Sequence, residues 1–202
     1  MTPDYITLAR ALLPETALVV GALLVLGFDL AYGRRHTAGE RLGAALAIAL
    51  MACATAIYDT VVVGNLGPVF GGALMLDSLT VATRIGVFVL ALLTLGVAAA
   101  ARTPRHPAEY VALLLFATTG FSVMAAANQL LVAFVALELA SLSLYVLAGF
   151  DKDRPESAEA ALKYFLFGGM AAAFLLFGFS LIYGLTGEIN FARISLDRKS
   201  VV

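Results

Sequence analysis

The sequence predicts an all-α polytopic membrane protein. Hydrophobic residues make up 61% of its 202 positions and charged residues 13%, and the mean hydropathy is +0.95. Apolar runs of about twenty residues, the helix length that crosses a bilayer core, recur along the chain. A soluble domain of this size needs far more charged surface. We therefore expect a single transmembrane domain with about six helices.

The predicted spans lie at about 12–32, 42–57, 79–101, 109–126, 129–150 and 160–184. Pro14 and Glu15 are typical of a helix start, because proline is tolerated in the first turn and a carboxylate suits the positive end of the helix dipole. The longest connection, 59–78, is rich in Val, Gly, Asn and Pro, which predicts an extended or hairpin-like excursion at the interface. A polar tail from about 185 to 202 closes the chain.

Loop charges predict the orientation of the spans. The loops after the first, third and fifth spans contain seven basic residues: Arg34, Arg35, Arg41, Arg102, Arg105, Lys152 and Arg154. The opposite side contains Arg10, apart from Arg193, Arg198 and Lys199 in the tail, which break the pattern. The positive-inside rule then places the three basic loops in the cytoplasm and the N-terminus outside.

Composition excludes several classes of function. The net charge of −1 gives no reason to expect a nucleic-acid partner, and no run of Lys and Arg is long enough for a lipid-headgroup patch. The single Cys53 lies in an apolar span and is expected to act as a small hydrophobe. His36 and His106 lie in polar loops without neighbours at metal-ligand spacing, so no metal site is predicted. No nucleotide-binding or hydrolase motif is present.

Glu138 is the most informative residue, because it lies near the middle of the apolar run QLLVAFVALELASLSLYVLAGF. A charge at that depth costs at least ~2.5 kcal/mol, so it is expected to face protein or water. Helical spacing places Phe134, Ser141, Leu142 and Tyr145 on its face, and the two hydroxyls extend a polar stripe. The hydrophobic environment favours the protonated carboxyl and a nearby cation favours the ionised one, a balance suited to proton transfer. A hydrogen-bonded carboxyl that never titrates is the structural alternative.

Lys163 in the sixth span is the candidate counter-charge. It should lie roughly 10 Å from Glu138 along the membrane normal, so a direct ion pair needs helix tilt or bridging water. Glu159 lies four residues before it, and an ordinary surface pair would explain the lysine equally well. The sequence thus predicts a proton-translocation site at Glu138 and Lys163 and leaves the role of the lysine open.

The remaining polar residues in the spans have structural interpretations. Arg84 is expected to reach the outer interface or to pair with Asp77. Asp29, Asp59 and Glu109 lie near span ends, where solvated carboxylates cost little. Two small-residue pairs of the sixth span indicate close helix packing; they are Gly168 with Ala172 and Gly169 with Ala173.

The stretches LELASLSLYVLAGF and EAALKYFLFGG resemble subunit N of the proton-pumping NADH:quinone oxidoreductases, bacterial complex I, and weaker resemblance extends over about 12–191. The resemblance implies that Glu138 is the proton-channel glutamate and that Lys163 belongs to a line of buried charges. It also implies a multi-pass protein of the bacterial inner membrane with an extracytoplasmic N-terminus. Other membrane subunits of the complex, both sister antiporter-like and small ones, would be its partners beside the lipid bilayer. The chain would then form part of a translocase without a redox site or cofactor of its own, since NADH, FMN, the iron–sulfur clusters and quinone belong to partner subunits.

The sequence departs from that family in length. The family continues well beyond six helices, and neither its seventh-helix lysine nor its second inverted repeat has a counterpart in this sequence. We therefore expect a fragment or a truncated product. Two other readings stay open: a subunit of a multi-subunit sodium/proton antiporter or membrane hydrogenase, and a non-conducting structural scaffold.

Overall fold

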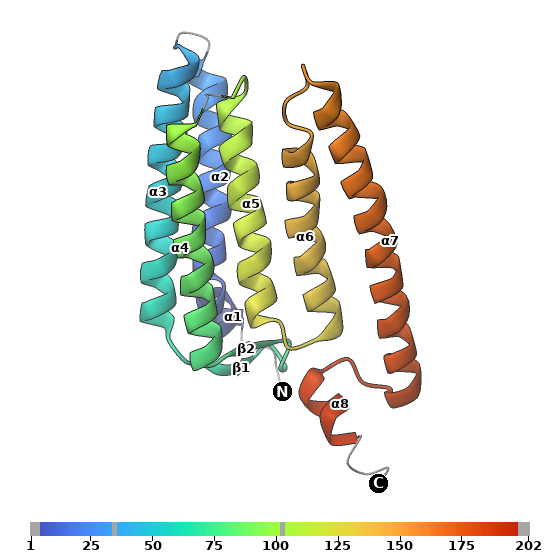
Figure 1. Cartoon of the computed structure of the whole chain (residues 1–202). Coiled ribbons are helices and arrows are strands. Elements are labelled where there is room, and N and C mark those ends of the chain that lie inside the picture. The colour runs from blue at the N-terminus through green and yellow to red at the C-terminus, as the bar shows by residue number, and fades with distance from the viewer. Residues whose placement is uncertain (1–4, 34–35, 102–103, 198–202) are drawn as a thin grey trace.

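A computed structural model describes residues 5–33, 36–101 and 104–197, and these residues form eight helices and one hairpin (Figure 1). The elements are α1 (Tyr5–Ala11), α2 (Leu13–Tyr32), α3 (Ala38–Val63), β1 (Gly67–Val69), β2 (Leu74–Leu76), α4 (Ser78–Ala100), α5 (Pro107–Ala126), α6 (Leu130–Ala148), α7 (Pro155–Thr186) and α8 (Phe191–Asp197). In this part of the chain six helices, α2 to α7, are long and apolar enough to cross a membrane, which confirms the predicted fold class. The short helices α1 and α8 were not predicted.

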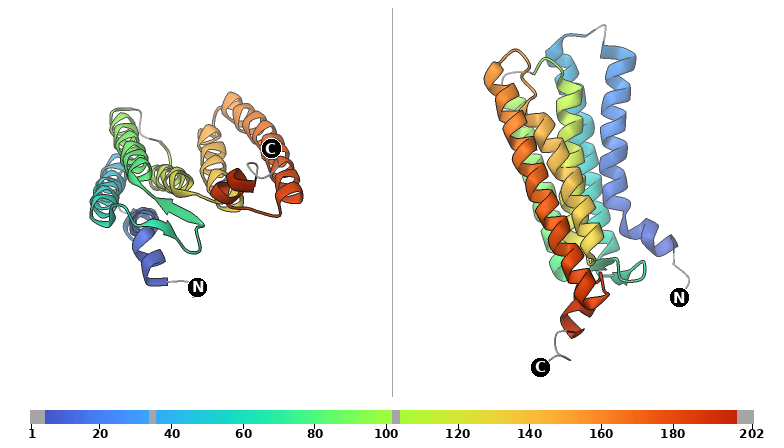
Figure 2. Two further views of the ribbon diagram at one scale, coloured as in Figure 1. Left: turned by 90° about the horizontal axis from the view of Figure 1, so that it is seen from below. Right: turned by 90° about the vertical axis from the view of Figure 1, so that its right-hand side faces the viewer.

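Helices α2 to α5 pack together, α6 packs on α5, and α7 packs on α6 at the edge of the bundle (Figures 1 and 2). The first and last described helices, α1 and α8, lie at the end of the bundle that carries the hairpin, as expected for an even number of spans. We call this end the hairpin end and the other the loop end.

The main core lies between α2, α3, α4 and α5. Its buried residues are mostly Ala, Leu and Val, with Phe88 as the largest. Small side chains allow the helices to approach closely, which substitutes for the hydrophobic effect between helices in lipid. Cys53 is fully buried in this core as a free thiol, as predicted.

The hairpin-like excursion is confirmed in a shorter form. Strands β1 and β2 pair antiparallel, with Gly67 opposite Leu76, and Val69, Leu74 and Leu76 form a second buried cluster with Ala11 and Ala126. The three valines expected in the excursion instead continue α3 to Val63, where Gly64 ends the helix with a φ of 58°. Continuing the helix satisfies backbone groups that an extended segment near lipid would leave unpaired.

The other differences lie at helix starts. Helix α3 begins at Ala38 because Thr37 and Glu40 form a capping box. Helix α7 begins at Pro155, five residues before the predicted position, with the proline in its first turn.

The segment after α7 docks on the hairpin end. The side chain of Asn190 donates to the carbonyl of Gly72 at 2.7 Å, and the amide of Phe191 donates to the carbonyl of Asn128 at 3.1 Å. The first part of the expected polar tail is therefore packed structure. Five basic residues used to predict orientation lie outside the described residues: Arg34, Arg35, Arg102, Arg198 and Lys199.

Candidate proton-translocation site

Helix α6 uses opposite faces to contact its two neighbours. On one face, Ala136 and Ala140 meet α5 at Gly120, where an added Cβ would lie 2.6 Å from the backbone nitrogen of Ala140. On the other face, Tyr145 packs against α7, with its ring edge-to-face on Tyr164 at a centroid distance of 4.8 Å. Glycine is therefore required on α5 to bring the two backbones this close.

Glu138 lies near the middle of α6 on the face that carries Tyr145, two turns away. Glu138 is partly buried. Within the part of the chain that the structure describes, its carboxylate has no hydrogen-bond or ion-pair partner. The structure thus places an uncompensated carboxyl at mid-span on the side of α6 that faces α7, with Ser141 and Tyr145 on the same face.

Lys163 lies on α7 and pairs with Glu159, with its Nζ 2.5 Å from the Oε1 of that residue. Its side chain is 65% exposed, which differs from the buried position that the family resemblance implies. Helix α7 lies at the edge of the bundle and has no buried residue. Within it, Ala161 meets α6 at Gly149, and Lys163 is rotated by about 200° from Ala161 around the helix, away from that contact.

The structure does not bring Glu138 and Lys163 together. Because Tyr145 stacks on Tyr164 in this antiparallel helix pair, Lys163 is level with the loop-end part of α6. Glu138 lies two turns further toward the hairpin end, roughly 10 Å away along the axis. This separation agrees with the spacing expected from the sequence.

The small-residue pairs of α7 make one close contact. A Cβ on Gly168 would lie within 3 Å of three atoms of the Tyr145 ring and hydroxyl, so this glycine makes room for the tyrosine. Gly169 has no atom within 4 Å of its Cβ position, so it lies on a face of α7 without such a contact.

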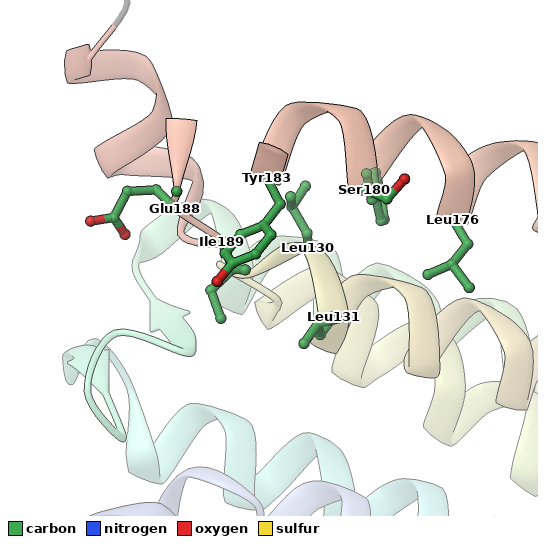
Figure 3. Close-up of a pocket in the computed structure, with 9 residues that line it drawn as sticks. Leu130, Leu131, Leu176, Ser180, Tyr183, Glu188 and Ile189 are labelled. Atoms are coloured by element: carbon green, nitrogen blue, oxygen red, sulfur yellow. The ribbon is translucent and has the colours of Figure 1, made fainter. Parts of the chain in front are cut away.

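A cavity of about 550 Å³ lies between α6 and α7 at the hairpin end (Figure 3). Leu130, Leu131 and Leu176 form its apolar wall and Tyr183 brings a hydroxyl to it, whereas the carboxylate of Glu188 points away from the other labelled side chains (Figure 3). No Lys, Arg or His lines it among the described residues.

The structure contains a buried ion pair that the sequence reasoning missed. The Arg84 guanidinium lies 2.8 Å from the Oε1 of Glu15, with the side chains 1% and 5% exposed. The hydroxyl of Ser122 donates to the same Oε1 at 2.5 Å. We refer to Glu15, Arg84 and Ser122 as the buried polar cluster; it joins α2, α4 and α5 near the hairpin end.

The expectation that Arg84 reaches the interface or pairs with Asp77 was therefore wrong. Arg84 donates further to the backbone carbonyls of Ala11 at 3.2 Å and of Ser122 at 3.4 Å, so it lies inside the bundle. Asp77 instead caps α4 by accepting the amide of Thr80 at 2.8 Å. The available signal was the occurrence of two opposite charges within predicted spans, since each needs a buried partner.

Two carboxylates at helix ends, Asp29 and Asp77, have defined hydrogen-bond partners. Asp29 was expected to be solvated, but Arg41 of α3 donates to it at 2.6 and 2.5 Å in a partly buried bidentate pair between α2 and α3. At Asp77, hydrogen bonds from the backbone amide and the side chain of Thr80 hold the pKa of the carboxyl below its ordinary value.

Across residues 5–33, 36–101 and 104–197, no three His, Cys, Asp or Glu side chains gather into a metal site.

Comparison with known proteins shows which family this chain is similar to. The model of the transmembrane domain of the NADH:quinone oxidoreductase/Mrp antiporter family matches residues 127–200, which include both Glu138 and Lys163. NADH-quinone oxidoreductase subunit N 2 of Acidobacterium capsulatum is 39% identical over 96% of this chain. The chain spans 41% of the length of that relative.

Two solved structures have the same fold. A chain in the respiratory complex I of Thermus thermophilus superposes with a TM-score of 0.70 and 30% identity, over 88% of this chain and 38% of that chain. A chain of a membrane-bound sulfane sulfur reductase, an archaeal respiratory membrane complex, superposes with a TM-score of 0.72 and 23% identity, over 92% of this chain and 39% of that chain. At this identity the second likeness shows the fold alone. The chain is therefore a homologue of part of NADH-quinone oxidoreductase subunit N.

Proposed function

We propose that this chain is part of a proton-translocating membrane subunit of a respiratory NADH:quinone oxidoreductase, and that Glu138 accepts and releases the proton. The observation that carries the proposal is a carboxyl at mid-span without a described partner, in a chain homologous to subunit N. Placing a carboxyl at this depth is costly, and a proton relay is a function that would retain it. Ser141 and Tyr145 supply hydroxyls on the same face that could bind relay water.

Lys163 has a different place in this proposal. Its ammonium is held by Glu159 on the exposed face of α7 and lies about 10 Å along the axis from Glu138. It therefore acts on Glu138 by a longer-range field or through water rather than by direct contact. In this arrangement Glu138 is the residue that binds the proton.

The partners follow from the same assignment. The subunit would reside in the bacterial inner membrane among sister antiporter-like and small subunits, with the hairpin end facing outward. NADH, FMN, the iron–sulfur clusters and quinone would be bound by partner subunits, and this chain would contribute proton transfer as part of a translocase.

The test replaces Glu138 by Gln in the complete complex, in membrane vesicles energised with NADH. The expected result is loss of the acidification signal per NADH oxidised, with unchanged complex assembly on native gels. Glu138→Asp keeps the carboxyl and should retain part of the signal, and Glu156→Gln, which removes an exposed acid from α7, should leave it intact. Full acidification by an assembled Glu138→Gln complex would refute the role of Glu138.

A sodium/proton antiporter subunit is the second candidate, because the matching family model covers both kinds of protein. Co-purification separates the two. Flavin and iron–sulfur subunits should accompany a complex I component, whereas small membrane subunits alone would indicate the antiporter. A scaffold role would be indicated if the Glu138→Gln complex both assembled and pumped normally.

A further inference from the structure

A second cavity, of about 720 Å³, lies at the loop end, where α5 and α7 begin and α6 ends. Its walls come from residues 104–106, from residues 150–154, and from Tyr110, Leu147 and Ser157. The ring of Tyr110 stacks edge-to-face on Phe150 at a centroid distance of 5.3 Å, so the floor is aromatic. The cavity is therefore bounded by two loops above and by helix ends below.

Charged side chains from both loops gather at this cavity, three of them basic and two acidic, Asp151 and Asp153. Arg105 comes from the loop before α5, and Lys152 and Arg154 come from the loop before α7. The link between the two loops is an exposed pair, in which the Arg105 guanidinium lies 3.3 Å from Asp153 and both side chains are about three-quarters exposed. Lys152 has no described ion-pair partner in residues 104–197. No run of basic residues in the sequence predicted this cluster, because its members come from two separate loops.

An apolar groove, a separate cavity that shares no lining residue with the first, lies next to it along α5 and α6. Tyr110 and Leu147 line the charged cavity, and one turn deeper on the same helix faces Leu114 and Leu144 line a second cavity of about 380 Å³. Helix α4 completes that cavity with Leu90, Ala91 and Leu95, so it lies between α4, α5 and α6. The two neighbouring cavities together are charged at the bundle end, with one more basic than acidic residue, and apolar toward the middle, which is the polarity pattern of an amphiphile.

We propose that this space binds an anionic phospholipid, with its phosphate against Arg105 and Lys152 and one acyl chain in the groove between α4, α5 and α6. Basic pockets between membrane helices are suited to anionic headgroups. A soluble anion would use only the polar part, and a zwitterionic lipid would gain less from the free lysine. The neighbouring apolar groove therefore favours a lipid as the source of the phosphate.

The test uses the full chain in detergent micelles and measures lipid retention by native mass spectrometry. Phosphatidylglycerol should bind more tightly than phosphatidylcholine, and the double variant Arg105→Gln/Lys152→Gln should weaken phosphatidylglycerol binding about 30-fold, at roughly 1 kcal/mol per basic side chain. Arg193→Gln is the matched control, because it removes an exposed positive charge at the hairpin end. Circular dichroism and gel filtration verify that each variant is folded, and Lys152→Gln alone provides a milder change.

The groove is tested separately with Ala91→Phe, whose larger side chain fills it. Ala82→Phe is the matched control, because it adds the same side chain at an exposed position of α4. Loss of phosphatidylglycerol with the first and retention with the second supports the proposal. Equal binding of the two lipids, or wild-type binding by the folded double variant, would overturn it. Displacement of the lipid by inorganic phosphate, with Ala91→Phe having no effect, would indicate a soluble-anion site and overturn the lipid assignment.

Discussion

Removing one partner of the buried ion pair should be among the most destabilising substitutions in this chain. In Glu15→Gln, the Arg84 guanidinium stays inside the bundle with 1% exposure and no counter-charge. Arginine cannot lose its proton to avoid this. Breaking a buried pair in this way costs about 3–5 kcal/mol of unfolding free energy.

The reverse substitution leaves the other charge of the pair unpaired. In Arg84→Met, the buried carboxyl of Glu15 loses its counter-charge and keeps the hydrogen bond from Ser122. The double variant Glu15→Leu/Arg84→Met removes both charges and should lie within about 1 kcal/mol of wild type or above it, because the pair's attraction is offset by the cost of desolvating both charges. With the single variants Glu15→Leu and Arg84→Met it forms a double-mutant cycle, and the sign of the coupling energy separates a favourable pair from a merely compensated one.

The assay is unfolding in mixed micelles by titration with dodecyl sulfate, followed by far-UV circular dichroism, since the chain has no tryptophan. The exposed Glu159–Lys163 pair is the matched control, with 63% and 65% exposure at 2.5 Å. Its coupling energy should be about 0.3–0.5 kcal/mol. A Glu15→Gln variant within about 1 kcal/mol of wild type would refute the reasoning.

Three further outcomes are expected. Gly120→Ala should lower the unfolding free energy by about 1–3 kcal/mol, because its Cβ would meet the α6 backbone. Gly169→Ala has open space around its Cβ and should be neutral or slightly stabilising. Equal effects of the two substitutions in the same unfolding assay would contradict the close contact at Gly120. Ser122→Ala should cost about 1.5–3 kcal/mol by removing a donor to a charged oxygen, and a smaller loss by dodecyl sulfate titration would show that the hydroxyl is replaceable. The pKa of Asp77 is lowered in the folded state, so the stability that its helix cap contributes is fully present above the unfolded pKa of about 3.9 and is lost as the pH falls through the folded value. Asp77→Asn should abolish that pH dependence in thermal melts. An unchanged pH profile in Asp77→Asn would show that the dependence does not come from Asp77.

Much of the fold could be predicted because hydrophobic runs and helical spacing are local signals. Each apolar run had to become a helix, since lipid leaves no other way to satisfy the backbone. The face shared by Glu138 and Tyr145 followed from helical spacing, and the depth of Lys163 relative to Glu138 followed from helical rise. These properties depend on a single helix or on two neighbouring ones.

The sequence by itself thus determined the number of spans and the mid-span position of Glu138. Only the tertiary structure decided which buried charges meet and which faces are covered. Glu15 and Arg84 are 69 positions apart, and they pair because α2 and α4 present them to the same interior, a relation that no local pattern encodes. Likewise Lys163 and Ala161 are close in sequence, but only the packing of α6 against one side of α7 determines which of them is partly covered. The physical reason is that the enclosure of a group, and with it the cost of its charge, depends on what surrounds it in three dimensions.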